Sequence, residues 1–361
     1  MINIYVVCHK KAIVPDNGCL KPVQVGTALA DSCLEGMEYD DGITDNISDK
    51  NRSYCELTAQ YYAWKKLCTK ENKDNMKLPV DTVSGKGGVD NALIKPQACA
   101  PHNTLQGVQQ DTPDYIGFFH YRRYLSFSKI IEPEPDGALS PEDRRICPEI
   151  DLDSVTEDLA RYGFSEPHMS EVIRQHDVIT VLRERINTTV YRQYCQFHEE
   201  QTLRSVIRIM MEQHPGYEDA AREYLNSKQV YYFNMFIMKR EIFEEYAAWL
   251  FGILFEYEKT EEYKTAVQKD PRLMGFLAER LFGIYYTHLL KAGVKAAELQ
   301  CLRFYHTDPD RTVEEEIQST CIRRFTCKPL PVTIRLDMRR FNRLLPPGSR
   351  RRLFFRSLMY R

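Results

Sequence analysis

Positively charged side chains are concentrated in the run His120-Tyr121-Arg122-Arg123. The run begins at the end of residues 114–120, an apolar segment typical of a buried strand. Ligands of open α/β sheets bind beyond the carboxyl ends of the strands, and arginine presents a forked donor that matches phosphate oxygens. We therefore interpret His120, Arg122 and Arg123 as catalytic candidates that could offset the charge of a departing diphosphate, and Tyr121 as a binding residue. A surface arginine pair bridged to acids is the alternative.

Two more groups of polar residues could contribute to a binding site at the same edge. The N-terminal apolar segment 2–8 ends in His9 and Lys10. Residues 44–51 are dense in short polar side chains that could bind a ribose, a base edge or a sugar hydroxyl, or could simply make turns. The candidates in that loop are Asp45, Asn46, Ser48, Lys50 and Asn51.

Strands that alternate with helices must position these residues. Apolar segments predict strands at residues 2–8, 22–25, 114–120, 176–181 and 230–238. Helical spacing predicts helices at residues 55–67, 240–258 and 273–290, with additional helix between 162 and 175. We expect Asn51 or Ser53 to be the N-cap of the first helix. Alternation of this kind indicates an α/β sheet with helices on its faces.

Composition limits the classes of protein to be considered. The chain of 361 residues has a net charge of -2, eleven cysteines and no CxxC spacing. Free thiols in a reducing cytosol are the simplest account of an odd cysteine count. No apolar run approaches the roughly 20 residues that span a bilayer. The N-terminus begins as a strand and lacks the features of a signal peptide, so we expect a cytoplasmic protein.

Two segments differ from the rest of the chain. Residues 71–113 are polar, contain glycines without the spacing of a phosphate loop, and predict an inserted loop. Residues 328–361 hold nine arginines interleaved with apolar residues, and Asp337 is their only acid. This pattern favours binding to an anionic membrane surface, with a helical tail packed on its own domain as the alternative. Nucleic acid is not expected as a partner, because the rest of the chain has no basic stripe.

Motifs spread along the chain resemble those of a bacterial family of formally unassigned function. The family occurs in loci for capsular and exopolysaccharide synthesis, and its members are regarded as glycosyltransferases. The matching motifs appear in the expected order, up to about residue 290. They are residues 4–10, 22–26, 45–51, 55–59, 64–65, 117–124, 234–238 and 275–281.

The resemblance implies a nucleotide-diphospho-sugar transferase of the GT-A kind, with a Rossmann-type mixed sheet flanked by helices. Such enzymes usually hold a divalent metal with an Asp-x-Asp triplet. The triplets at residues 151–153 and 308–310 follow no convincing strand, and we interpret them as a helix N-terminus and a turn. Our hypothesis is that the cations at 120–123 replace the metal, so no cofactor is expected. Mn²⁺ or Mg²⁺ at one of the triplets is the alternative.

The resemblance also assigns roles to residues later in the chain. Asn234 lies in a segment similar to the strand that contacts the sugar, and Arg280 is a donor-binding candidate. Glu279 is the candidate general base, with a solvated helix face or a structural ion pair as the alternative. Glu56 is expected to cap its helix or contact the ribose.

Taken together, the sequence predicts a catalytic domain at residues 1–327 and a basic amphipathic tail at 328–361. The expected reaction moves a sugar, UDP-linked and galactose-type, to a lipid-linked glycan at the inner face of the plasma membrane during surface polysaccharide synthesis. The alternatives are a non-catalytic scaffold of an assembly complex, a nucleotide-sugar hydrolase and a phosphosugar transferase.

Overall fold

The computed structural model describes residues 1–75, 112–134, 137–154, 159–307, 322–327, 332–337, 344–345 and 351. Most of the expected insertion at 71–113 and most of the basic tail lie outside these residues. Within the tail, residues 332–337 pair with residues 322–327 as antiparallel strands. The boundary expected between residues 327 and 328 therefore falls between two strands of one hairpin.

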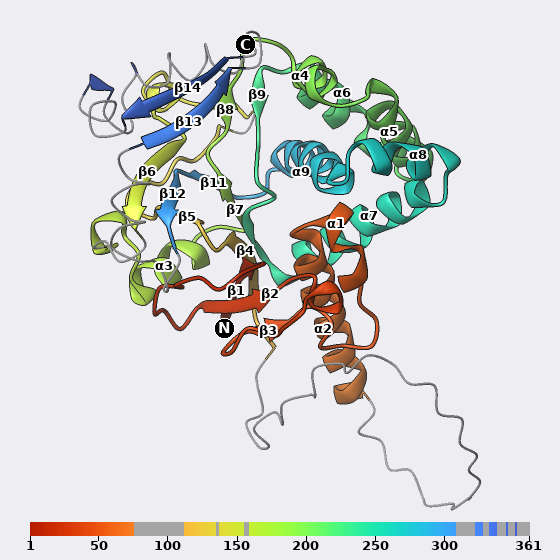
Figure 1. Ribbon diagram of the computed structural model, residues 1–361, viewed down its shortest axis with the longest axis horizontal. Coiled ribbons are helices and arrows are strands. Elements are labelled where there is room, and N and C mark those ends of the chain that lie inside the picture. Colours follow the sequence, from red (N-terminus) through yellow and green to blue (C-terminus); the bar gives the residue numbers. More distant parts are fainter. Residues whose placement is uncertain are drawn as a thin grey trace, which may run out of the picture.

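A mixed sheet of ten strands forms the centre of the fold (Figure 1). Its main path has the order β11-β7-β10-β4-β1-β2-β3, and β5, β6 and β12 extend it from β4. β1 pairs in parallel with both β2 and β4, whereas β10 runs antiparallel to β4 and β7. The strands are β1 (Ile2–Cys8), β2 (Leu20–Gln24), β3 (Glu38–Tyr39), β4 (Tyr115–His120), β5 (Arg123–Leu125), β6 (Glu149–Ser154), β7 (Val178–Val181), β10 (Phe236–Lys239), β11 (Ala296–Leu299) and β12 (Cys301–His306). Short pairs are formed by β8 (Glu184–Arg185) with β9 (Gln229–Val230), and by β13 (Ile322–Cys327) with β14 (Val332–Asp337).

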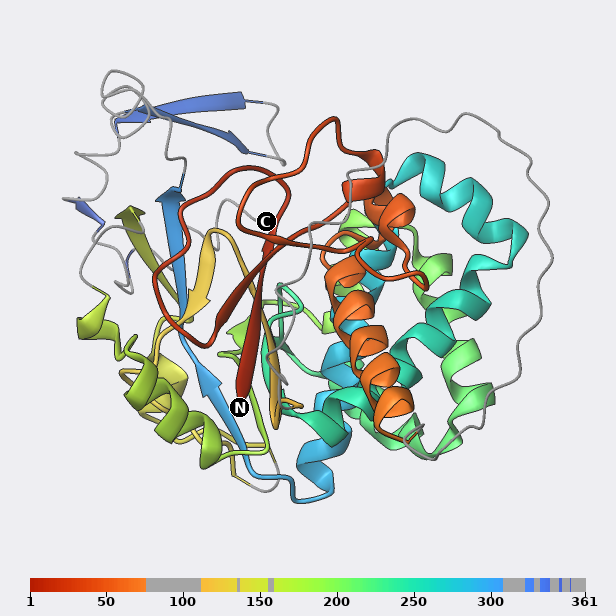
Figure 2. The same cartoon turned by 90° about the horizontal axis from the view of Figure 1, so that it is seen from below.

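Helices cover both faces of the sheet, as Figure 2 shows, with α3 on one side and the larger group on the other. Successive residues of β1 enter two different cores, Tyr5 and Val7 facing the larger group while Ile4 and Val6 face α3. The expected α/β fold with a mixed sheet flanked by helices is confirmed. The helices are α1 (Asn51–Tyr54), α2 (Leu57–Asn75), α3 (Glu166–Arg174), α4 (Val190–Phe197), α5 (Glu200–Gln213), α6 (Glu218–Asn226), α7 (Arg240–Glu258), α8 (Glu261–Lys269) and α9 (Leu273–Lys291). Among the described residues, no helix combines the length and apolarity of a membrane span.

Three local expectations were wrong. The strand expected at 230–238 is interrupted before β10, where Phe233 and Asn234 adopt φ angles of 79° and 49°. Asp151 lies inside β6 and not at a helix N-terminus, because β6 pairs in parallel with β12 and Asp151 accepts a hydrogen bond from Arg303. The helix expected to begin at Cys55 is two helices, since Cys55 has a φ of 51° and separates α1 from α2. Asn51 and Ser53 therefore lie within α1, and neither is its N-cap.

Candidate functional site

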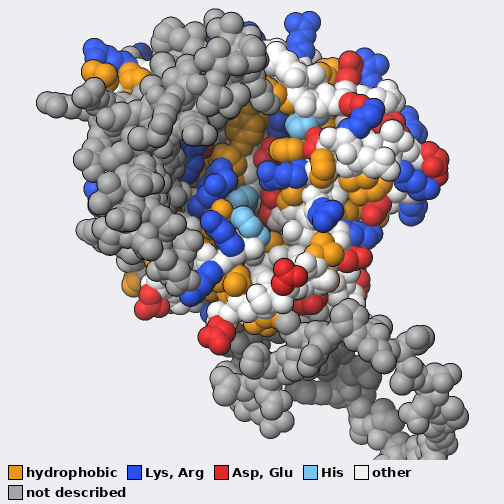
Figure 3. Space-filling view, in the orientation of Figure 1, with side chains coloured by type: hydrophobic (Ala, Val, Ile, Leu, Met, Phe, Trp, Pro, Cys, Tyr) orange, Lys and Arg blue, Asp and Glu red, His pale blue; other side chains and the backbone are white. Residues whose placement is uncertain are grey.

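A cavity of about 1530 Å³ opens at the carboxyl ends of β1 and β4. In Figure 3, Lys and Arg side chains gather around this hollow, together with histidine. Two walls enclose it, and the remaining lining comes from residues 51–56. The strand-end wall consists of Val7, His9, Val25, His120, Tyr121, Arg122 and Arg123. The helical wall consists of lining residues from 184–202, 232–233 and 266–280.

The order of the strands places the strand-end wall. After β1 the chain continues into β2 on one side, and it later returns as β4 on the other side. Such a switch point is where open α/β sheets form a crevice for ligands. Val7 of β1 lies opposite His120 of β4, and the Tyr121 N–H donates to the Val7 carbonyl at 3.0 Å. The residues that follow both strands, His9 and Arg122 among them, therefore come together.

Cationic side chains surround the Tyr121 ring. The His9 ring packs edge-on at 5.0 Å between centroids, Lys10 Nζ lies 5.6 Å from the ring centre, and Arg122 Cζ lies 5.7 Å from it. Within the described part of the chain, Arg122 has no carboxylate partner. Lys10 does not itself line the cavity. The phenol face thus holds positive charge at the cavity edge by cation–π attraction.

His120 and Arg123 each leave a buried nitrogen without a hydrogen bond. Within the described residues, neither Nε2 of His120 nor Nε of Arg123 has a partner. The Arg123 guanidinium lies over the Phe233 ring at 4.5 Å. Burial, and then the charge of Arg123, lower the pKa of His120 to about 3, so its imidazole is neutral at pH 7. Buried donors without partners are rare in folded proteins, and a bound oxyanion would satisfy the donor of Arg123.

Two carboxylates, Glu56 and Glu279, face the same cavity. Glu279 accepts from the Phe233 N–H at 2.8 Å and lies 3.3 Å from Arg280, whereas Glu56 accepts from the Asn234 amide at 2.7 Å. Burial raises the pKa of both carboxyl groups, although Arg280 opposes the effect at Glu279 and Asn234 opposes it at Glu56. Raised pKa values bring both groups closer to the range in which a carboxylate serves as a base near neutral pH.

Backbone strain is concentrated beside these carboxylates. Among the described residues other than glycine, only Cys55, Phe233 and Asn234 have positive φ. Such conformations cost of order 1–3 kcal/mol each and persist where surrounding contacts hold them. Here Phe233 and Asn234 donate the hydrogen bonds to Glu279 and Glu56, and Cys55 directly precedes Glu56. The strained backbone therefore positions both carboxylates.

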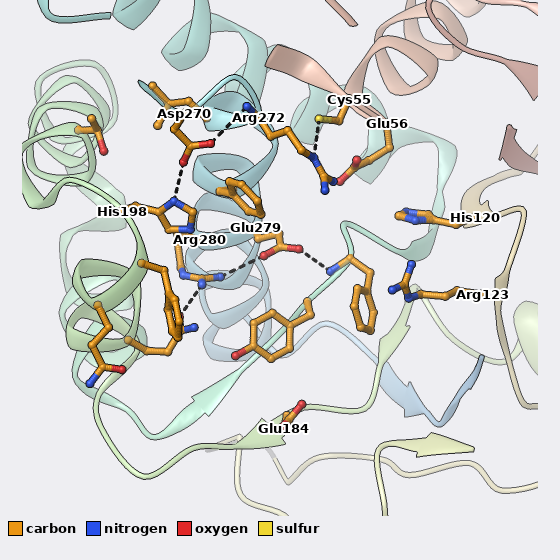
Figure 4. Close-up of a pocket in the computed structure, with 18 of the residues that line it drawn as sticks. Cys55, Glu56, His120, Arg123, Glu184, His198, Asp270, Arg272, Glu279 and Arg280 are labelled. Carbon is orange, nitrogen blue, oxygen red and sulfur yellow. Dashed lines mark hydrogen bonds and ion pairs between the residues drawn. The ribbon is translucent and has the colours of Figure 1, made fainter. Parts of the chain in front are cut away.

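Arg272 was missed at the sequence level, although it lies near the centre of the site. Its Nε donates to Cys55 Sγ at 3.4 Å, as Figure 4 shows. Its charge acts to lower the pKa of Glu56 and Glu279. A cation in the turn immediately before the helix that carries Glu279 was the available signal. The helical wall also contains residues that we did not predict, among them Gln193, Phe197, His198, Asp270 and Phe276.

Most predicted residues reach the cavity, but four residues of the loop before α1 do not. Those brought together are His9, Asn51, Glu56, His120, Tyr121, Arg122, Arg123, Glu279 and Arg280. Asp45 accepts from Tyr61, Asn46 donates to the Ile43 carbonyl, Ser48 donates to Asp40, and Lys50 pairs with Glu258. These contacts fix the loop itself. Asn234 is buried behind Glu56 and does not line the cavity.

The described residues do not fit a carboxylate-held metal at the cavity. They contain no group of three His, Cys, Asp or Glu side chains arranged to hold an ion. Asp151 is paired with Arg303 at 2.7 Å and does not line the cavity, and residues 308–310 lie outside the described residues. At the strand-end wall, the groups placed to meet an anion are arginines and neutral histidines.

Comparisons with known proteins agree with this architecture. A solved structure described as the apo structure of the bifunctional glycosyltransferase WbbM matches with a TM-score of 0.63 and 26% identity. The match covers 86% of this chain and 47% of that one, so the chain spans about half the length of its structural neighbour. No curated protein matches. The family model described as "Domain of unknown function (DUF4422)" matches residues 3–76 and 108–291, on both sides of the expected insertion. The chain therefore belongs to the DUF4422 family.

Proposed function

We propose that this protein is a glycosyltransferase that moves a sugar from a nucleotide-diphosphate donor to an acceptor hydroxyl. The observation that carries the proposal is the cavity itself, where uncompensated cations at the strand ends face two part-buried carboxylates. The similarity to a glycosyltransferase structure supports the same class of reaction.

The strand-end wall has the chemistry needed to bind the diphosphate. Arg122 and Arg123 supply charged donors without acidic partners among the described residues, and Arg272 adds a third cation at the same cavity. As the bond between the anomeric carbon and the diphosphate oxygen breaks, negative charge grows on the leaving group. Donors fixed beforehand in a partly enclosed site stabilise that charge at little reorganisation cost. The neutral His120 adds no charge to this wall.

Glu279 is suited to accept the proton of the acceptor hydroxyl. Burial raises its pKa, and the Phe233 N–H and Arg280 hold its two oxygens, so its orientation is fixed. Proton transfer to Glu279 leaves the acceptor oxygen able to bond to the anomeric carbon, and the nucleoside diphosphate departs. A base positioned in this way contributes about 10²–10⁴-fold to a rate.

The finer identity of the reaction is also part of the proposal. We retain UDP as the nucleotide, a galactose-type sugar, and a lipid-linked glycan acceptor in surface polysaccharide synthesis. The arginine-rich segment 328–361 would hold the enzyme at an anionic cytoplasmic membrane surface.

A thermal-shift screen with UDP, GDP, CMP and their sugar conjugates, with Mn²⁺ or with EDTA, tests the proposal. A ligand that binds only the folded state raises the melting temperature. We expect one nucleotide to raise the melting temperature by the same amount with EDTA as with Mn²⁺. We expect the shift to be lost in Arg122→Ala and kept in Arg208→Ala, which removes an exposed arginine of α5. Stabilisation only with Mn²⁺ would contradict the role of the cations, and no stabilisation by any nucleotide would favour a scaffold.

A further inference from the structure

The proposed diphosphate site uses the strand-end wall and Arg272, and most of the helical wall has no assigned ligand. Ligand pockets for single small molecules enclose roughly 300–1,000 Å³. This cavity, at about 1530 Å³, is larger. Figure 4 shows Glu279 between His120 and Arg123 on one side and Arg280 and His198 on the other. A transfer reaction needs its general base between the donor and acceptor subsites. Glu279 has this position, because the acceptor hydroxyl must meet the donor beside it.

Aromatic side chains of the helical wall offer an apolar surface with fixed polar neighbours. The His198 ring lies 4.4 Å from the Phe276 ring at 37°, and its Nδ1 donates to Asp270 at 2.6 Å, so its orientation is fixed. Phe197, at the end of α4, is 39% exposed although it lines the cavity. Apolar rings with a few polar groups at set positions are typical of a binding site that orients a ligand.

Apart from Arg272, which was assigned above to the diphosphate and whose Cζ lies 5.3 Å from the Phe276 ring centre, the charges of this wall are largely compensated. Lys269 pairs with Glu199 at 2.7 Å, His198 pairs with Asp270, and Arg280 pairs with Glu279. This balance contrasts with the strand-end wall, where Arg122 and Arg123 have no acidic partner among the described residues. The helical wall is therefore suited to a ligand without charge.

One buried donor of the helical wall has no partner within the protein. Arg280 is 2% exposed, its terminal nitrogens bond to Gln193 and Glu279, and its Nε has no hydrogen-bond partner among the described residues. A buried donor that lines a cavity is normally satisfied by water or by a ligand. A ligand hydroxyl oxygen would meet this requirement next to the proposed base.

We propose that the helical wall binds the acceptor, and that the group it takes is a neutral sugar ring stacked on Phe276 with a hydroxyl directed at Glu279. Gln193, His198 and Arg280 would contact the other hydroxyls of that ring. This inference rests on the proposed glycosyltransferase function, because it locates the second substrate, the acceptor, in the same cavity.

Saturation-transfer NMR with methyl β-D-galactopyranoside as the probe tests the subsite. The wild-type protein should transfer saturation to the ring protons, and Phe276→Ala should weaken binding about tenfold because the apolar ring face is lost. Gln193→Ala, a milder change, should weaken it in the same direction. Phe255→Ala, a part-buried aromatic of α7 outside the cavity, should leave binding unchanged.

A second measurement separates this proposal from the proposed function. We expect the UDP thermal shift to survive in Phe276→Ala and to disappear in Arg122→Ala, with the reverse pattern for the sugar probe. Loss of the UDP shift in Phe276→Ala would overturn the proposal, because the helical wall would then hold the donor. Absent probe binding, or equal binding of methyl galactopyranosiduronate, would also overturn it. A wild-type protein that no nucleotide stabilises would instead refute the transferase function itself.

Discussion

Two arginines that face each other across the β5–β12 ladder should have different effects when each is replaced by alanine: one replacement should lower stability, and the other should weaken anion binding. Arg123 and Arg303 are register partners. Arg303 bridges Glu149 at 3.3 Å and Asp151 at 2.7 Å, whereas Arg123 has a buried Nε without a hydrogen bond and rests on the Phe233 ring. The paired arginine should stabilise the fold, and the other should serve a bound anion.

The magnitudes follow from these contacts. A hydrogen bond to a charged group contributes about 1.5–3 kcal/mol, so Arg123→Ala should weaken UDP binding about 10- to 150-fold. The ring contact that is lost, about 0.5–2 kcal/mol, is offset by relief of a partly buried charge. We therefore expect the ligand-free Arg123→Ala protein to unfold with a free energy within about 1 kcal/mol of wild type. Arg303→Ala should cost about 3–5 kcal/mol, because it leaves two carboxylates without their cation.

Isothermal titration with UDP measures the first effect, and urea unfolding followed by circular dichroism measures the second. The reasoning is refuted if Arg123→Ala binds UDP within twofold of wild type. It is equally refuted if Arg123→Ala and Arg303→Ala lose the same stability, because Arg123 would then be a structural residue.

The other predictions concern the base, the strained backbone and the packing of α9. Glu279→Gln should lower kcat about 10²–10⁴-fold with unchanged UDP affinity. Because burial raises the pKa of Glu279, the wild-type kcat should rise with pH above the range of an ordinary carboxyl, and the variant should lose this limb. In a urea titration, Asn234→Ala should have a free energy of unfolding about 1 kcal/mol lower than Asn234→Gly, since only glycine adopts the positive φ without cost. Gly283→Ala should destabilise by about 1–3 kcal/mol because its Cβ would lie 2.0 Å from Tyr224, while Gly252→Ala, with nothing within 4 Å, should stabilise by up to about 1 kcal/mol in the same urea titration.

The fold and the strand-end wall were accessible from the sequence because both depend on local apolar patterns. The segments 2–8 and 240–258 have the bounds of β1 and α7. Once these strands are placed, the rule for switch points brings His9 and residues 120–123 to one edge, and the structure does place them together. Their roles in binding and catalysis stay predictions.

The rest depended on contacts between distant residues. The turn at residues 233–234 is held by hydrogen bonds that it donates to Glu279 of α9 and to Glu56, the residue before α2. In the sequence, the apolar run there looks like a continuous strand. Asp45 and Ser48 were candidates by residue type and by their place in the matching motif 45–51, but short polar side chains as readily bond within their own loop. The position of Arg272 just before the helix of Glu279 was a signal in the sequence, but only the folded chain places it beside Cys55.

The two walls of the cavity come from stretches of chain that do not overlap. The strand-end wall ends at Arg123, and the first residue of the helical wall is Glu184. A single recombination event between related genes, with its crossover between these positions, would replace one wall and leave the other unchanged. Under the proposed assignment of donor and acceptor to the two walls, such an event would create new pairings of substrates without rebuilding either half of the site. The same assignment predicts that laboratory chimeras joined in this interval combine the donor of one parent with the acceptor of the other.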